Sequence, residues 1–293
     1  MNIKNFFVAF SCLLCVAASA IAQDDINPTI VASMNKLTYN PKLHKNGVGS
    51  VIGEVAVAVL AGQTSKEMVG YENAVQAAVV QGMSNSFRLK VVDGLTDEDL
   101  EYPYVVYVDG DITNMTTTSK TEVETYEEKS TKKTRSRTYF RGQVAVTLQV
   151  KDAHDGSVIA SPSFNITESD MSWIETAEGA MNRALEVLSK KVRLCFNEIF
   201  PLTGNIIERA GDKNDKQKEV YIDLGASHGM REGVVLLVYR DKVIAGKKAR
   251  EEIARLKVKK VEGDEVSLCK VTSRGKDLKA ALDAGDTLII ETK

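Results

Sequence analysis

The chain has 293 residues, of which 43% are hydrophobic, and its 40 acidic and 38 basic residues give a formal net charge of −2. A chain of this length can form two domains of ordinary size, each with its own hydrophobic core. The balanced charge excludes a global electrostatic field that would attract nucleic acid or an anionic membrane, so either partner would require a local cluster of charge.

The N-terminus has the three parts of a secretory signal peptide. Lys4 is followed by an apolar segment from Phe6 to Ala18, and small residues then lead to Ala22. This pattern predicts a signal peptide over residues 1–22, with cleavage after Ala22. The apolar segment is too short to anchor the chain, and no later run of about 18 apolar residues exists. We therefore expect an exported protein that is periplasmic or associated with the outer membrane.

Only two of the four cysteines remain after this cleavage. Cys12 and Cys15 lie in the predicted signal peptide, and Leu14 stands where lipid attachment at Cys15 would require a small residue. Cys195 and Cys269 fall on apolar faces of different predicted domains. We expect two buried thiols, with a single interdomain disulfide as the alternative.

The first half of the mature chain alternates strand and helix patterns. Strands are predicted from Ile30 to Tyr39 and from Arg88 to Asp93, and the stripe of apolar residues from Met68 to Phe87 has the period of a helix. The run from Tyr104 to Ile112 is nearly all apolar to Val108, as expected for a strand in the centre of a sheet. Residues 45–65 are small, apolar and interrupted by glycine, which leaves helix and strand both open.

The run from Gly142 to Thr167 predicts a β-hairpin with one apolar face. Apolar residues alternate with polar ones along both strands, and Asp152 to Gly156 form the turn. Ser172 and Glu175 have the spacing of a capping box, which predicts a helix from there to about Ile199. We expect the apolar stripe of this helix to cover the apolar face of the hairpin.

The segment 116–140 is rich in threonine, serine and charged residues. Composition alone is typical of disorder, but folding the segment about positions 129 and 130 pairs Glu122 with Arg137, Glu124 with Arg135 and Glu127 with Lys132. Such cross-strand pairs are each worth about 0.2–1 kcal/mol. The pairing predicts a charged β-ribbon arm. Its register differs by one residue from the register that matches Ile112 with Val146 and Val108 with Val150, and we predict a bulge at Gly142 that absorbs the difference.

The chain changes character after Phe200-Pro201, which ends the long helix. Six short β-type runs follow, separated by turns rich in glycine and aspartate: Gly204–Ile207, Glu219–Leu224, Gly233–Tyr239, Ala254–Val261, Glu265–Thr272 and Thr287–Glu291. This spacing predicts a small antiparallel β-barrel. The predicted fold class is α+β, with a mixed or antiparallel sheet covered by two helices over residues 23–202 and the small barrel over residues 203–293.

No set of residues predicts catalysis, a metal or a cofactor. Gly225-Ala226-Ser227-His228-Gly229 matches the nucleophile elbow of serine hydrolases, but that turn requires a helix directly after it, and a strand is predicted here. We therefore expect an ordinary glycine-rich turn. His44 and His154 have no neighbouring ligand at the spacing of a metal site.

The order of elements resembles the CsgG family of curli secretion. The similarity rests on the first strand and helix, on Phe87-Arg88-Leu89-Lys90-Val91-Val92-Asp93, on Val105-Val106-Tyr107-Val108-Asp109-Gly110-Asp111-Ile112, and on the hairpin and long helix. The same α/β unit occurs in the N-terminal domain of TolB and the middle domain of FlgT. The C-terminal part, with Val220-Tyr221-Ile222-Asp223-Leu224-Gly225, looks like the small β domain that ends FlgT. The resemblance implies a non-enzymatic envelope protein that acts through protein contacts, often as an oligomer.

We therefore expect an exported scaffold or assembly factor whose partners are envelope proteins or further copies of the chain. Nucleic acid is not an expected partner, and membrane association is expected to be peripheral at most. The arm and the exposed loops of the C-terminal domain supply the expected contact residues: Glu122, Glu124, Tyr126, Glu127, Lys132, Lys133, Arg135, Arg137, Ser227 and His228.

Two alternatives belong to other classes of protein. One is a component of an oligomeric outer-membrane secretion channel. Lipid-facing strands alternate apolar residues over about nine to eleven positions, whereas Val123 and Tyr126 are the only sizeable apolar residues from Thr116 to Thr138. The other is a serine hydrolase that uses Ser227.

Overall fold

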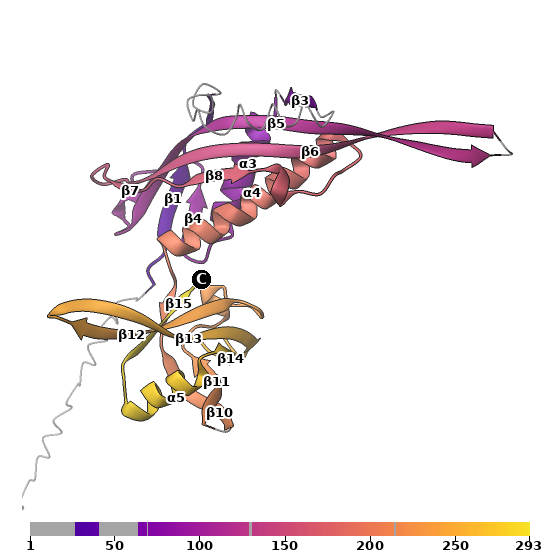
Figure 1. Cartoon of the computed structure of the whole chain (residues 1–293). Helices are drawn as coiled ribbons and strands as arrows, with labels where there is room; N and C mark the ends of the chain where they lie inside the picture. The colour runs from indigo at the N-terminus through magenta and orange to yellow at the C-terminus, as the bar shows by residue number, and fades with distance from the viewer. Residues whose placement is uncertain (1–26, 41–63, 69, 129–130, 214) are drawn as a thin grey trace, which may run out of the picture.

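The computed structural model describes residues 27–40, 64–68, 70–128, 131–213 and 215–293 (Figure 1). The predicted signal peptide, His44 and residues 45–63 lie outside this part of the chain. Within it, no helix combines the length and the apolar character that crossing a membrane requires.

The chain forms two sheets that share no strand among these residues. Sheet A is mixed and contains eight strands. Its elements, in chain order, are β1 (Ile30–Met34), β2 (Thr38–Tyr39), β3 (Thr64–Glu67), α3 (Glu72–Ser84), β4 (Leu89–Val92), η1 (Asp99–Glu101), β5 (Val105–Glu128), β6 (Thr131–Asp152), β7 (Val158–Ala160), β8 (Ser163–Ile166), η2 (Glu168–Asp170) and α4 (Ala177–Ile199).

The strands of sheet A follow the order β4-β1-β5-β6-β7. β1 runs parallel to β4 and to β5, while β5 and β6 form a long antiparallel pair. β2 and β3 add to β5, and β8 adds to β6. The predicted central position of the apolar run from Tyr104 is confirmed, because β5 lies in the middle of this order.

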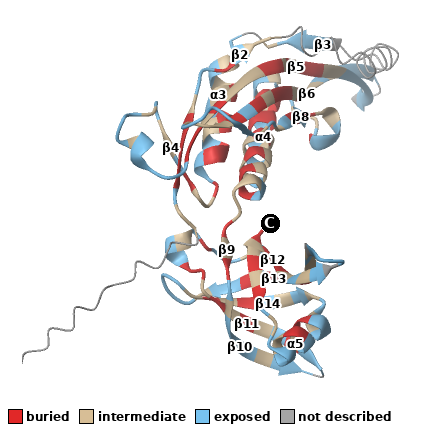
Figure 2. Cartoon of the chain, turned by 90° about the vertical axis from the view of Figure 1, so that its left-hand side faces the viewer, coloured by how far each residue is buried: buried red, intermediate tan, exposed pale blue. Residues whose placement is uncertain are grey.

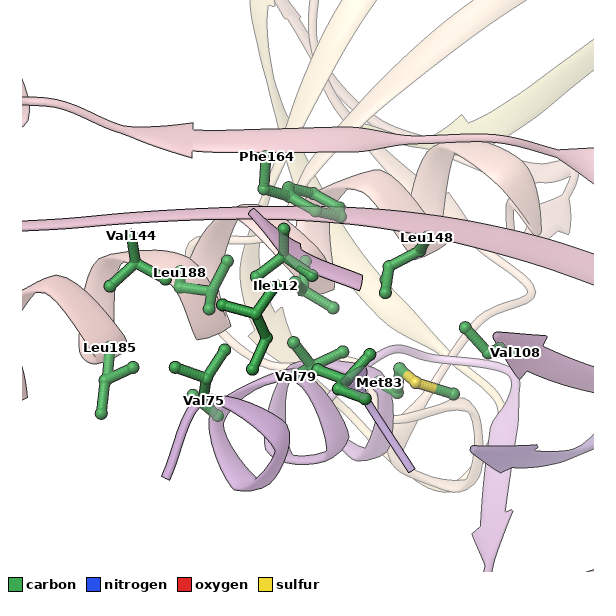
Figure 3. Close-up of a cluster of buried hydrophobic side chains, with 14 of the residues drawn as sticks. Val75, Val79, Met83, Val108, Ile112, Val144, Leu148, Phe164, Leu185 and Leu188 are labelled. Atoms are coloured by element: carbon green, nitrogen blue, oxygen red, sulfur yellow. The ribbon is translucent and has the colours of Figure 1, made fainter. Parts of the chain in front are cut away.

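Helices α3 and α4 bury one face of sheet A. Figure 3 shows side chains of both helices against side chains of the strands: Val75, Val79 and Met83 from α3, Leu185 and Leu188 from α4, and Val108, Ile112, Val144, Leu148 and Phe164 from β5, β6 and β8. Alternation along β6 puts Val144, Val146, Leu148 and Val150 on this face, and each of them is buried. Burying one such side chain contributes about 1.5–3 kcal/mol.

The predicted start of α4 is wrong by several residues. Thr176, rather than Ser172, is the N-cap, and its hydroxyl accepts a hydrogen bond from the Gly179 backbone N–H at 3.1 Å. Ile174 forms a β-bridge with Phe140. The chain is therefore still extended at the proposed capping box, because pairing with sheet A satisfies its backbone.

The predicted bulge at Gly142 is also wrong. Both predicted registers are observed, but the extra residue is Thr113 on the opposite strand, between Ile112 and Asn114. Gly142 continues the ladder opposite Thr117. A Cβ at Gly142 would lie 2.5 Å from the carbonyl oxygen of Ala180, so the glycine is required by the close approach of α4 rather than by a bulge.

The C-terminal part of the chain forms sheet B, which has seven antiparallel strands, and one α-helix. Its elements are β9 (Thr203–Gly204), β10 (Ile206–Lys213), β11 (Lys216–Ile222), η3 (Ala226–His228), β12 (Val235–Ile244), β13 (Lys247–Val261), β14 (Ser267–Ser273), α5 (Gly275–Ala284) and β15 (Leu288–Thr292). The strand order is β10-β11-β14-β13-β12-β15-β9, and no described ladder joins the two end strands as a closed barrel would require.

Helix α5 is absent from the predicted elements and is the third α-helix of the described residues. It spans ten residues and buries only Leu278 and Ala281. The two sheets have separate hydrophobic clusters, and Figure 2 shows buried residues on β5, β6 and α4 and a second group on β12, β13 and β14.

Contacts between the two parts of the chain centre on the start of β4. Phe87 precedes that strand but packs against the hydrophobic cluster of sheet B. The Arg88 guanidinium donates to the carbonyl oxygens of Pro28 and Pro201, both at 3.1 Å. The Asn27 side chain donates to the Thr203 carbonyl at 2.7 Å. Asn27, Phe87 and Arg88 thus contact the segment that leads into sheet B and the hydrophobic cluster of that sheet.

Both described cysteines are free thiols. Burial raises the pKa of Cys269 to about 12 and also raises that of the half-buried Cys195, where the charge of Glu198 adds to the effect. We expect a chromogenic disulfide reagent near neutral pH to leave Cys269 unmodified in the native chain lacking residues 1–22, and to modify Cys195 slowly. Both thiols should react at once in denaturant, whereas no reaction even there would reveal the interdomain disulfide.

Candidate interaction surface on the β5–β6 arm

The β5–β6 pair continues far beyond the rest of sheet A. The ladder between β3 and β5 ends at Ser119, and the bridge from β6 to Ile174 ends at Phe140. Beyond these points, residues 120–128 and 131–139 pair only with each other within the described chain. Figure 1 shows this arm extending to the right past α4. Among the described residues, no further strand pairs with the backbone N–H and C=O groups along either edge of the arm.

The arm has two chemically different faces, because successive side chains on a strand point to opposite sides. One face carries charged and aromatic residues that stand opposite each other in the ladder. The pairs are Lys120 with Tyr139, Glu122 with Arg137, Glu124 with Arg135, and Tyr126 with Lys133. The other face carries Thr121, Val123 and Thr125 opposite Thr138, Ser136 and Thr134. The Thr121 and Thr138 hydroxyl oxygens lie 3.0 Å apart.

Charge is also divided between the two strands. β5 carries Glu122, Glu124 and Glu127, while β6 carries the lysines and arginines that oppose them. Lys120 is the exception on β5, and its Nζ lies 2.6 Å from the Glu122 carboxylate. One edge of the arm is therefore acidic and the other basic.

An aromatic and cationic cluster holds the base of the arm. Trp173 contacts both the Lys120 ammonium, 4.6 Å from its ring centroid, and the Arg141 guanidinium, 4.3 Å away. Lys120 also lies 5.9 Å from the Tyr139 ring centroid. Cation–π contacts of this kind are worth about 0.5–2 kcal/mol each. The segment before α4 thus fixes the arm where it leaves the core.

Sequence reasoning missed this cluster. Trp173 is the only tryptophan in the chain, but nothing near it in the sequence indicates that it lies on the arm. Its contact with Lys120 and Arg141 depends on the bridge between Phe140 and Ile174, which pairs a loop with a distant strand. A lone tryptophan ahead of a helix is a weak signal for such a contact.

Eight of the ten predicted contact residues lie together on the arm: Glu122, Glu124, Tyr126, Glu127, Lys132, Lys133, Arg135 and Arg137. Arg137 is partly buried and the other seven are exposed. A hydrogen bond with Tyr139 raises the pKa of Arg137, so its guanidinium remains charged throughout the physiological range.

Ser227 and His228 lie in sheet B and not on the arm. They form η3, which ends at Gly229 with a φ of 73°, and the next regular element is strand β12. The predicted turn is thus observed, without the helix that a nucleophile elbow needs directly after it. A Cβ at Gly229 would lie 3.4 Å from the Phe87 ring, which places this turn beside the junction between the two units.

The hydrogen bonds of Ser227 and His228 serve the turn itself. The Ser227 hydroxyl donates to the Asp264 carbonyl at 2.6 Å. His228 Nδ1 accepts from the Gly225 backbone N–H at 3.3 Å and lies 3.2 Å from Ser227 Oγ. The serine proton is therefore directed to a backbone oxygen and not to the imidazole. Among the described residues, no group of three or more His, Cys, Asp or Glu could hold a metal ion.

No family model and no curated protein sequence matches the chain. Solved structures that are similar to it include a Xanthomonas campestris protein of the family DUF330, with a TM-score of 0.31 and 10% identity over 59% of this chain and 84% of that one. Another is a neuraminyllactose-binding hemagglutinin homolog from Helicobacter pylori, with a TM-score of 0.28 and 11% identity over 59% of this chain and 82% of that one. Similarity at this level bears on neither the family nor the function of this chain.

Proposed function

We propose that this chain is a non-enzymatic scaffold or assembly factor of the cell envelope, and that the arm is its main contact with a protein partner. The protein would be periplasmic or associated with the outer membrane. On this proposal residues 23–202 form a CsgG-like or TolB-like unit with two covering helices, and residues 203–293 form a FlgT-like small β domain. The order of elements supports this assignment, as does the absence of a catalytic set in the sequence.

The observation that carries the proposal is the arm itself. A ribbon with no covered face is marginally stable in water, yet this one extends as a regular ladder well beyond the core. Its open edges can take up a further strand, and its opposite charges give each edge a preferred partner. Val123 and Tyr126 add exposed apolar surface, with 66% and 45% of their areas accessible.

Reversing the basic edge should abolish this contact. We expect Arg135→Glu with Arg137→Glu to weaken partner capture from envelope extract at least tenfold, about 1.4 kcal/mol, because acids would then line both strands. The fold should be retained, since each exposed cross-strand pair contributes about 0.2–1 kcal/mol or less. Quantitative affinity capture with mass measurement of the intact complexes checks both the partner and the stoichiometry.

Two further variants give this experiment its controls. Lys218→Glu with Lys257→Glu makes the same change of charge at exposed strand positions of sheet B and should leave capture unchanged. Glu122→Arg with Arg137→Glu keeps the pair within the arm but exchanges its charges, so it should weaken capture without loosening the ribbon. Unchanged capture by all three variants would rule out the arm as the contact. Retention in membranes that resists high salt would instead favour the channel alternative.

A further inference from the structure

The β12–β13 hairpin forms a second projection. The ladder between β12 and β15 ends at Arg240, and the ladder between β13 and β14 ends at Arg255. Residues 241–250 therefore pair only with each other within the described chain, and Figure 1 shows this finger extending to the left of sheet B. Its turn consists of Ala245 and Gly246, with φ values of 50° and 79°, which is the geometry of a tight two-residue hairpin turn.

Charges at the base of the finger are paired. The Arg240 guanidinium lies 3.1 Å from the Glu251 carboxylate and 2.9 Å from that of Asp286. Arg250 pairs with Asp241 at 3.4 Å and also with Glu291. These contacts neutralise both strands where the finger leaves the sheet.

The tip of the finger differs sharply from its base. From Lys242 to Ala249 the sequence is Lys-Val-Ile-Ala-Gly-Lys-Lys-Ala and contains no acid. Lys242 contacts Glu251 at 3.2 Å, but Lys247 has no ion pair among the described residues. Val243 is 71% exposed, the highest value for a large hydrophobic residue in the described part of the chain. The ladder pairs Val243 with Lys248 and Ile244 with Lys247, so the exposed Val243 and the exposed Lys247 both lie within two positions of the turn.

We propose that this tip binds the surface of an anionic lipid bilayer. The Val243 side chain would enter the interface between headgroups and acyl chains, and the Lys247 ammonium would contact headgroup phosphates. The chain as a whole is slightly acidic, so the attraction is local to the tip. A free phosphate or a nucleic acid would use the lysines but leave Val243 in water. A protein contact of ordinary stability buries about 1,200–2,000 Å², far more than a hairpin tip presents.

Flotation with vesicles tests the proposal on the full chain from residue 23. We expect binding to phosphatidylcholine vesicles that contain phosphatidylglycerol and none to phosphatidylcholine alone. Lys247→Gln with Lys248→Gln should lower the partition coefficient roughly 25-fold, because each lysine near an anionic surface contributes a factor of about five. Val243→Asp should lower it about tenfold by removing the apolar insertion.

A matched control comes from the tip of the other projection. Lys132→Gln with Lys133→Gln removes the same charge from the arm, where glutamates balance it, and should leave partitioning within about twofold. Circular dichroism checks that every variant is folded. The proposal would be overturned by equal binding to phosphatidylcholine alone, by displacement with soluble glycerol phosphate, or by tighter binding to a duplex oligonucleotide with the same dependence on Lys247 and Lys248. It does not depend on the function proposed for the arm.

Discussion

Replacing Phe196 by alanine is expected to lower the free energy of unfolding by about 3–5 kcal/mol. Phe196 is completely buried on α4, within the cluster between the two helices and sheet A, and its ring centroid lies 6.4 Å from that of Phe200. Truncation leaves a cavity in the middle of the interface, which the regular helix cannot close by a small movement. Denaturant unfolding followed by far-ultraviolet circular dichroism measures the loss.

Leu194 provides the control, because it lies on the same helix with 45% of its area exposed. Leu194→Ala should change the free energy of unfolding by no more than about 0.5 kcal/mol. An equal loss for both variants would indicate that helix propensity, and not the packed core, determines stability here.

Replacing Gly142 by valine is expected to cost about 3 kcal/mol or more, at the upper end for overpacked sites. In an ordinary strand the change would be favourable, because valine is a strong strand former. Here the added Cβ would lie 2.5 Å from the Ala180 carbonyl oxygen and 3.0 Å from the Ala184 Cβ. The first turns of α4 would have to move away from sheet A.

The same substitution at Gly211 is the matched control. Gly211 lies on β10, and no heavy atom comes within 4 Å of an added Cβ. Gly211→Val should leave the protein as stable as before or raise its stability by up to about 1 kcal/mol. If Gly142→Val were equally harmless, the close packing of α4 against β6 would be incorrect. Thermal unfolding of the two variants beside the parent chain decides between these outcomes.

The register of the arm is readable in the sequence because its pairs are local. Glu122, Glu124 and Glu127 stand opposite Arg137, Arg135 and Lys132 once the chain turns at positions 129 and 130, and the observed ladder has that pairing. The apolar alternation from Val144 to Val150 likewise predicts which side of β6 is buried. Both signals depend on a period of two and on short-range complementarity, which a sequence displays directly.

The errors occur where a distant segment determines the local structure. The sequence places the bulge at Gly142 because glycine often marks one, whereas the structure puts the extra residue at Thr113 and uses the glycine to admit α4. The start of α4 moves to Ala177 because Ile174 pairs with Phe140. In each case the local sequence is compatible with two structures, and a contact with a distant segment determines which of them forms.

The candidate surfaces divide in the same way. Eight contact residues are predictable from the sequence because the charged ribbon places them together. Ser227 and His228 are predicted as contact residues only because they lie in an exposed loop, and the structure places them beside the other sheet. The Trp173 cluster and the β12–β13 finger have no comparable signal. Lys242 and Lys247 look like ordinary surface charges until the ladders show that the neighbouring strands end before the tip.

By itself, the sequence determined that the chain combines α-helices with β-sheet, the order of β1, α3, β4, β5, β6 and α4, and the register of the arm, because periodicity and cross-strand charge act over a few residues. The tertiary structure decided where α4 begins, which strand carries the bulge, how α5 packs and which hairpins project into solvent. Those features depend on contacts between residues that are far apart in the sequence. Local periodicity and residue propensity do not reveal such contacts.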